Sequence, residues 1–181
     1  MRRKSCAFTG HRPRKFPWRY DETDERCVKL KEALVEQIEK LVADGFMDFL
    51  SGMAEGVDTW AAEIVLALRK QNPTLKLHCI LPCREQADKW SNSARERYRV
   101  ILEQADSIVY VNQVYRKNCM LERNRFLVNH ADLLLAVYNG EQRGGTAATV
   151  RSARKQSKEI VILDPDMNGS HTDSSGQSFF R

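Results

Sequence analysis

Four short segments hold the residues that could do chemistry, and each combines glycine or asparagine with charged or hydroxyl side chains. The segments are Thr9-Gly10-His11-Arg12-Pro13, Ser51-Gly52-Met53-Ala54-Glu55-Gly56-Val57-Asp58, Asn118-Cys119-Met120-Leu121-Glu122-Arg123-Asn124 and Asn139-Gly140-Glu141-Gln142-Arg143-Gly144-Gly145-Thr146. Glycine lets a backbone turn sharply and come close to a ligand. Free N–H groups at a helix start bind anions, and the forked guanidinium of arginine suits phosphate. The segments therefore indicate a ligand that carries phosphate.

The fourth segment, ending in Gly144-Gly145-Thr146, is the strongest candidate for the phosphate site. It joins the most apolar run of the chain, 133–138, to a predicted helix at 146–156. Its two glycines allow backbone approach, and the Thr146 hydroxyl can cap the helix while it contacts a phosphate. Neither GxxxxGK[ST] nor GxGxxG occurs in the chain, so neither a P-loop nor a standard dinucleotide fingerprint is predicted.

The first two segments offer titratable groups beside their glycines. Thr9 contributes a hydroxyl and Arg12 a cation, and His11 can serve as a donor, a general acid or a general base. Asp58 can accept hydrogen bonds from ribose hydroxyls or cap a helix, and both interpretations stay open. For Glu55, a solvated position is favoured over a catalytic one.

The third segment places Arg123 and Asn124 just before an apolar helical face. Surface charge on a helix explains these two residues when they are taken alone, and Arg125 is equally available. The predicted ligand-binding residues of all segments together are Thr9, Gly10, His11, Arg12, Ser51, Gly52, Gly56, Asp58, Arg123, Asn124, Gly144, Gly145 and Thr146. The candidates for catalysis are His11, Asp58 and Glu55, and no residue is predicted to bind a metal.

The elements that must position these segments alternate along the chain. Strands are predicted at 5–9, 47–51, 75–81, 107–111, 133–138 and 160–163, and helices at 21–44, 57–70, 84–105, 120–129 and 146–156. The strands are continuous apolar runs, which is typical of a sheet that helices cover on both faces. This pattern predicts an α/β fold with a Rossmann-like, doubly wound and mainly parallel sheet. Such sheets bind ligands beyond the carboxyl ends of their strands, where the segments lie.

Composition narrows the class of protein. The 181 residues, 42% of them hydrophobic, predict a single domain at 1–167 and a flexible polar C-terminal tail at 168–181. The segments described above make a Rossmann-like nucleotide-ligand-binding domain the expected kind. No apolar run approaches the roughly 20 residues of a membrane span, and no secretory signal is present. A cytoplasmic protein without a membrane partner is therefore predicted. The five scattered cysteines lack metal-finger spacing, and no metal or other cofactor is predicted.

The ordered set of segments resembles the YpsA-like family over about residues 4–163. That family belongs to the SLOG superfamily, together with the DNA-processing protein DprA and the LOG phosphoribohydrolases. The resemblance implies a Rossmann-like fold that binds nucleotides or related ligands. Residues 51–58 are similar to the SGxAxGxD loop of DprA, and residues 144–146 to the phosphate loop of the superfamily.

One position departs from the LOG enzymes. Their PGGxGTxxE pattern ends in a glutamate that takes part in cleaving the N-glycosidic bond, and Thr149 stands at that place here. The departure favours binding over that hydrolysis.

Three functions remain in view. The first is binding or sensing of a nucleotide or a nucleotide-derived small molecule. The alternative is a nucleotide N-glycosidase or phosphoribohydrolase-type hydrolase, which would need another acid. The second alternative is single-stranded nucleic-acid binding, suggested by a sequence pI of about 9.0, by the resemblance to DprA, and by Trp18 and Tyr20 in or beside the basic stretch 12–19. A net charge of +5 on 181 residues is weak support for it. The sequence also leaves a homo-oligomer open.

Overall fold

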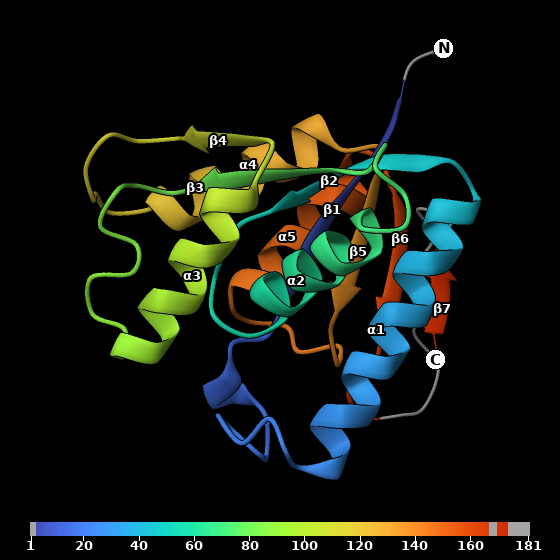
Figure 1. Cartoon of the computed structure of the whole chain (residues 1–181), viewed down its shortest axis with the longest axis horizontal. Helices are drawn as coiled ribbons and strands as arrows, with labels where there is room; N and C mark the ends of the chain where they lie inside the picture. The colour runs from blue at the N-terminus through green and yellow to red at the C-terminus, as the bar shows by residue number, and fades with distance from the viewer. Residues whose placement is uncertain (1–2, 167–169, 174–181) are drawn as a thin grey trace.

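The computed structural model describes residues 3–166 and 170–173, which form seven strands and five α-helices (Figure 1). In chain order the elements are β1 (Lys4–Gly10), a 3₁₀ turn η1 (Pro13–Lys15), α1 (Glu25–Ala43), β2 (Phe46–Ser51), α2 (Val57–Arg69), β3 (Lys76–Leu81), α3 (Asn92–Gln104), β4 (Ser107–Tyr110), α4 (Cys119–His130), β5 (Leu133–Val137), α5 (Gly145–Lys155), β6 (Glu159–Leu163) and β7 (Ser170–Asp173). The alternation of strands and helices matches the prediction.

One sheet runs through the molecule in the order β4-β3-β2-β1-β5-β6-β7. All neighbouring pairs are parallel except β6 and β7, which are antiparallel. The predicted Rossmann-like, mainly parallel α/β fold is confirmed. The strand order reverses between β1 and β5, where Gly10 pairs with Val137. Sheets of this kind bind ligands at such a reversal.

Helices cover both faces of the sheet (Figure 1). One set of buried side chains joins α1, α2 and α3 to the sheet, and a second set joins α4 and α5 to the opposite face. In α1, Leu30, Leu34, Ile38 and Leu41 recur at helical spacing and are buried. The apolar runs seen in the sequence therefore fill two cores, and the strand ends between them are left to polar segments.

Two helices begin later than predicted because a side chain caps each start. The carboxylate of Asp24 accepts from the Arg26 N–H, so α1 begins at Glu25 and not at 21. The Ser91 hydroxyl accepts from the Ala94 N–H, so α3 begins at Asn92 and not at 84. The preceding residues 84–91 form turns instead.

A strand occupies part of the predicted flexible tail. Residues 170–173 form β7, which pairs with β6 from Ile160 to Leu163. The flexible-tail prediction is wrong for these residues, because backbone pairing with the open edge of β6 does not require an apolar sequence. The remainder of 168–181 lies outside the described residues.

Two further features bear on the class of protein. No helix within 3–166 is long and apolar enough to cross a membrane. The five cysteines are buried and unpaired, and burial raises the pKa of Cys79 to about 12. The Cys79 thiol is therefore protonated at neutral pH.

Candidate functional site

A cavity of about 320 Å³ lies at the carboxyl ends of β1 and β5, bordered by α2, α4 and α5. Its lining includes these residues predicted from the sequence: Thr9, Gly10, His11, Arg12, Asp58, Arg123, Asn124, Gly144, Gly145 and Thr146. The volume lies within the range of small-molecule sites, about 300–1,000 Å³. Segments that are more than a hundred residues apart thus meet at one place.

The other predicted residues lie beside the cavity. Ser51, the last residue of β2, and Gly52, the first residue of the loop that precedes α2, are both buried. Glu55 and Gly56 line a neighbouring cavity of about 500 Å³. Burial raises the pKa of the Glu55 carboxyl, and the Arg12 cation opposes this rise. The structure therefore separates Glu55 from the other candidates for catalysis.

The start of α5 is open to the cavity. Its N-cap is Gly144, with φ of +107°, and neither a side-chain cap nor an acidic residue in the first turn is present. A side chain at Gly144 would meet nothing within 4 Å, and one at Gly145 would meet only the Asn124 amide, at 3.8 Å. The predicted capping by Thr146 is wrong, because the positive φ of Gly144 lets the helix begin one residue earlier.

Cations surround this helix start. Arg12, Arg14 and Arg143 line the cavity and form no ion pair within 3–166. Lys15 also lines it, but its ammonium pairs with Glu141 at 2.8 Å. The predicted binding residues include Arg12 and none of the other three, although Arg14 and Lys15 belong to the basic stretch 12–19 and Arg143 lies within the fourth segment.

A buried ion pair forms the floor of the cavity. The Arg123 guanidinium lies 3.8 Å from the Asp58 carboxylate, and the two side chains are only 5% and 8% exposed. Burial raises the pKa of Asp58, while the Arg123 and Arg12 cations and the Ala54 N–H oppose the rise. The view of Arg123 as surface charge is wrong, because α4 turns this side chain inward.

Arg123 also holds the loop before α2. Its Nη1 donates to the Gly52 carbonyl, which accepts a second hydrogen bond from Gln86 Nε2 at 3.0 Å. A side chain at Gly52 would collide with this guanidinium. Gly52 therefore makes room for Arg123 and not for a ligand.

The start of α2 is covered by the protein itself. A side chain at Gly56 would meet Pro13 at 2.9 Å, and one at Gly10 would meet Val57 at 2.5 Å. The Asp58 carboxylate accepts from the Ala54 N–H at 3.2 Å, so it satisfies a backbone donor of the loop that precedes α2. Of the two helix starts with flanking glycines, α5 is the one that faces the cavity.

His11 is buried in the cavity wall. Its Nε2 lies 3.0 Å from Asn139 Oδ1, which also accepts from the Glu141 N–H at 3.3 Å. Because that oxygen can only accept, His11 Nε2 is the donor in this contact, and in the neutral tautomer that fits it Nδ1 is an acceptor. The Phe16 ring packs against His11 at 6.0 Å between centroids.

Aromatic rings continue this wall away from the cavity. Phe16 stacks on Trp18 at 4.7 Å and on Trp60 at 5.8 Å, measured between ring centroids. Trp18 is only 6% exposed, and the Arg26 cation covers it. This packing argues against the predicted base-stacking role for Trp18. Tyr20 is 63% exposed, so its ring is accessible for stacking.

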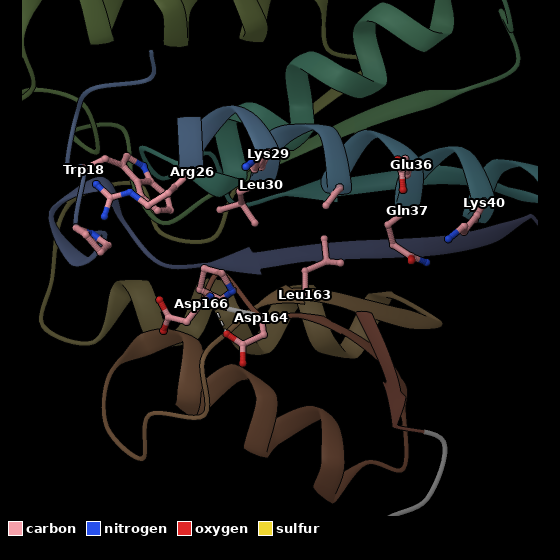
Figure 2. A pocket seen from close by; sticks show the side chains of 13 residues that line it. Trp18, Arg26, Lys29, Leu30, Glu36, Gln37, Lys40, Leu163, Asp164 and Asp166 are labelled. Atoms are coloured by element: carbon pink, nitrogen blue, oxygen red, sulfur yellow. Dashed lines mark hydrogen bonds between the residues drawn. The ribbon is translucent and has the colours of Figure 1, made fainter. Parts of the chain in front are cut away.

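A third cavity, of about 610 Å³, lies between α1 and the end of β6 (Figure 2). Its rim carries both signs of charge, with Arg26, Lys29 and Lys40 against Glu36, Asp164 and Asp166. The mixed charge does not favour an anion. Among the described residues, no group of three or more His, Cys, Asp or Glu side chains could hold a metal ion.

Comparison with known proteins agrees with this architecture. Residues 6–167 match the model of the YspA SLOG family, YpsA. A UPF0398 protein of Bacillus cereus strain B4264 is 34% identical over 158 residues, which cover 84% of each chain. A UPF0398 protein of Bacillus thuringiensis strain Al Hakam is 33% identical over the same share of each chain.

A solved structure shares the fold. It is DNA processing protein A from Helicobacter pylori, described for its single-stranded DNA binding mode. The TM-score is 0.59 at 20% identity, and the match covers 90% of this chain and 66% of the other. The resemblance seen in the sequence is confirmed: the chain belongs to the YpsA family of SLOG proteins.

Proposed function

We propose that the cavity between β1 and β5 binds a nucleotide or a nucleotide-derived small molecule. The open start of α5 carries this proposal, because it faces a cavity lined by Arg12, Arg14 and Arg143, which form no ion pair with the described residues. Helix starts with free N–H groups attract phosphate, and arginine forms charge-assisted hydrogen bonds to it. The phosphate would lie at Gly144, Gly145 and Thr146.

The rest of the ligand would lie across the cavity from α5. Asp58 Oδ2 is engaged by the Ala54 N–H, and the described residues donate no hydrogen bond to Oδ1. That oxygen can accept from a sugar hydroxyl. His11 Nδ1 offers a second acceptor, because Nε2 is held by Asn139. Thr9, Gly10, His11 and Arg12 would form the wall opposite α5.

Thermal denaturation with a ligand panel tests the proposal. Nucleoside mono-, di- and triphosphates, dinucleotides and ADP-ribose are each added at millimolar concentration. A ligand present at about 100 times its Kd stabilises the folded state by about 2.7 kcal/mol. At least one ligand should raise Tm, and Arg12→Gln/Arg143→Gln should remove the rise. The exposed Lys40→Gln/Lys70→Gln variant is the charge-matched control. If no ligand shifts Tm, the proposal is wrong.

A hydrolase at the same site is the second candidate, and Asp58 favours it. Burial raises the pKa of this carboxyl, as general acids at neutral pH require. The Thr149 hydroxyl, at the place of the LOG glutamate, donates to the Gly145 carbonyl at 2.8 Å and does not line the cavity. Free base released from a bound nucleotide, and lost in Asp58→Asn with ligand binding retained, would establish hydrolysis.

Single-stranded nucleic acid is the third candidate, favoured by the shared fold with DNA processing protein A and by exposed Tyr20. Phosphate contacts along a strand make the affinity fall steeply with salt. Fluorescence anisotropy with a labelled oligonucleotide at 50 and 200 mM salt measures that slope. An affinity that does not change with salt would argue against this candidate.

A further inference from the structure

A second basic groove begins where the proposed phosphate site ends. It has a volume of about 280 Å³ and runs between α4 and α5. Leu121 and Asn124 line both the groove and the main cavity, so the two spaces adjoin at these side chains. The groove therefore lies directly beside the proposed phosphate site.

The charges of this groove all have one sign. Arg125 contributes from α4, and Arg151 and Lys155 contribute from α5. No carboxylate occurs among the described residues that line it. Arg151 Nη1 donates to the Gln142 carbonyl at 2.7 Å, which ties the fourth segment to α5, while all three side chains are exposed. Such a groove attracts anions.

The floor of the groove leaves room for a ligand. Its α5 side is made of Ala148, Thr149 and Ser152, all of them small. Thr149 is buried, and its hydroxyl is turned to the Gly145 carbonyl. A glutamate at this position would bring a negative charge into a groove that otherwise carries only cations.

Asn124 joins the two spaces. Its Oδ1 accepts from Arg123 Nε at 2.7 Å, which fixes the orientation of the amide. The Nδ2 group then points toward Gly145, at 3.8 Å from the place of a side chain there. The buried Arg123 thus sets a donor at the passage from the helix start to the groove.

The position of the cations along α5 limits the kind of ligand. At about 1.5 Å per residue, Arg151 lies about 9 Å and Lys155 about 15 Å from Gly145 along the helix. Helical side chains lean toward the N-terminus, so both cations lie over the groove, and neither lines the main cavity at Gly144 and Gly145. The two phosphates of a pyrophosphate are adjacent and share one helix start. A groove set this far along the helix suits a phosphate that a sugar separates from the first.

We infer that the α4–α5 groove binds a second phosphate of the same ligand, an inference that rests on the proposed nucleotide site. The ligand class is a nucleoside with phosphate on both its 5′ and its 3′ side. Two sources share this chemistry, a free nucleoside 3′,5′-bisphosphate and a short oligonucleotide. The first phosphate lies at the start of α5, and the second lies among Arg125, Arg151 and Lys155.

Calorimetric titration compares three matched ligands for each of the four bases. They are the nucleoside 5′-monophosphate, its 3′,5′-bisphosphate, and the 5′-phosphorylated dinucleotide of the same base. A charge-assisted contact contributes about 1.5–3 kcal/mol, so the second phosphate should raise affinity at least about tenfold. A gain with the bisphosphate alone identifies the free nucleotide as the source, and a gain with the dinucleotide identifies the strand.

Two variants assign the gain to the groove. Arg125→Gln/Lys155→Gln should reduce the advantage of the second phosphate to less than about threefold and leave the monophosphate affinity unchanged. Lys40→Gln/Lys70→Gln, which removes the same charge away from α4 and α5, should keep the advantage. Monophosphate binding without any gain from a second phosphate overturns this inference and leaves the proposed function intact. If none of the ligands binds, both are overturned.

Discussion

Replacement of the buried Arg123 by methionine should destabilise the protein in a way that depends on pH. Methionine keeps most of the buried volume but leaves Asp58 without the cation that lies 3.8 Å away. The Gly52 carbonyl also loses its arginine donor. Removing one partner of a buried ion pair costs about 3–5 kcal/mol. We expect a loss of that size in the free energy of unfolding at pH 7.

Protonation of Asp58 limits the loss at lower pH. Burial raises its pKa in the folded state, so the folded protein holds this proton more tightly than the unfolded chain. The cost of a buried carboxylate therefore grows as pH rises from the unfolded pKa toward the folded one. With an unfolded pKa of about 3.9, protonation costs at most about 4 kcal/mol at pH 7 and about 1.5 kcal/mol at pH 5. With about 1 kcal/mol for the lost hydrogen bond, the loss should fall to about 2–3 kcal/mol at pH 5.

Urea denaturation followed by circular dichroism at pH 5 and pH 7 measures both values. Arg125→Met, an exposed change on the same helix, should alter stability by less than about 0.5 kcal/mol. Adding Asp58→Asn to Arg123→Met should recover at least half of the loss at pH 7. An equal loss at both pH values, with no recovery in the double variant, would refute the pairing of Asp58 with Arg123.

The remaining predictions concern glycines and a surface ion cluster. Gly52→Ala should destabilise the fold by about 1–3 kcal/mol in urea denaturation, because the new methyl group collides with Arg123. Gly145→Ala should leave stability nearly unchanged and weaken nucleotide binding in calorimetry. A stability loss in Gly145→Ala together with a stable Gly52→Ala protein would contradict the roles assigned to these two glycines. Glu22, bound by Arg97, Lys31 and the Trp60 indole, has a pKa lowered to about 2 by those hydrogen bonds, although burial opposes the shift. Its contribution to stability is present above the unfolded pKa and is lost as pH falls toward 2. Glu22→Gln should therefore lower Tm at pH 7 and lower it by a much smaller amount at pH 2.5, where only a part of that contribution remains, and an equal effect at both would contradict the lowered pKa.

Local patterns in the sequence were sufficient to predict the parallel part of the sheet and the helices that cover it. The apolar runs at 133–138 and 160–163 became β5 and β6, because a strand buried on both faces has to be apolar throughout. The location of the candidate site residues at the carboxyl ends of the strands followed from the prediction of a parallel sheet. The edge strand β7 was not predictable in this way, because its pairing depends on the backbone of β6.

The role of each residue in the site depended on contacts between distant segments. Gly52 and Gly144 look alike in the sequence. The Arg123 side chain occupies the space beside Gly52, whereas the space beside Gly144 is open. Arg123 and Arg125 are two residues apart, and the direction of α4 decides which one is buried. Only the three-dimensional arrangement distinguishes the two glycines. Helical spacing, in contrast, already places Arg123 on the face of Cys119 and Leu127, which lie four residues to either side and are buried.

The stack of rings behind His11 gives the protein an intrinsic fluorescent reporter. Phe16 lies between the cavity wall and the indoles of Trp18 and Trp60. Indole emission changes in wavelength and intensity with local packing and with nearby charge. A ligand that moves His11 would disturb Phe16 and, through it, these two tryptophans. Occupancy of the cavity could then be followed in real time on the unlabelled chain, with Trp90, which packs on Tyr98, contributing a more constant background.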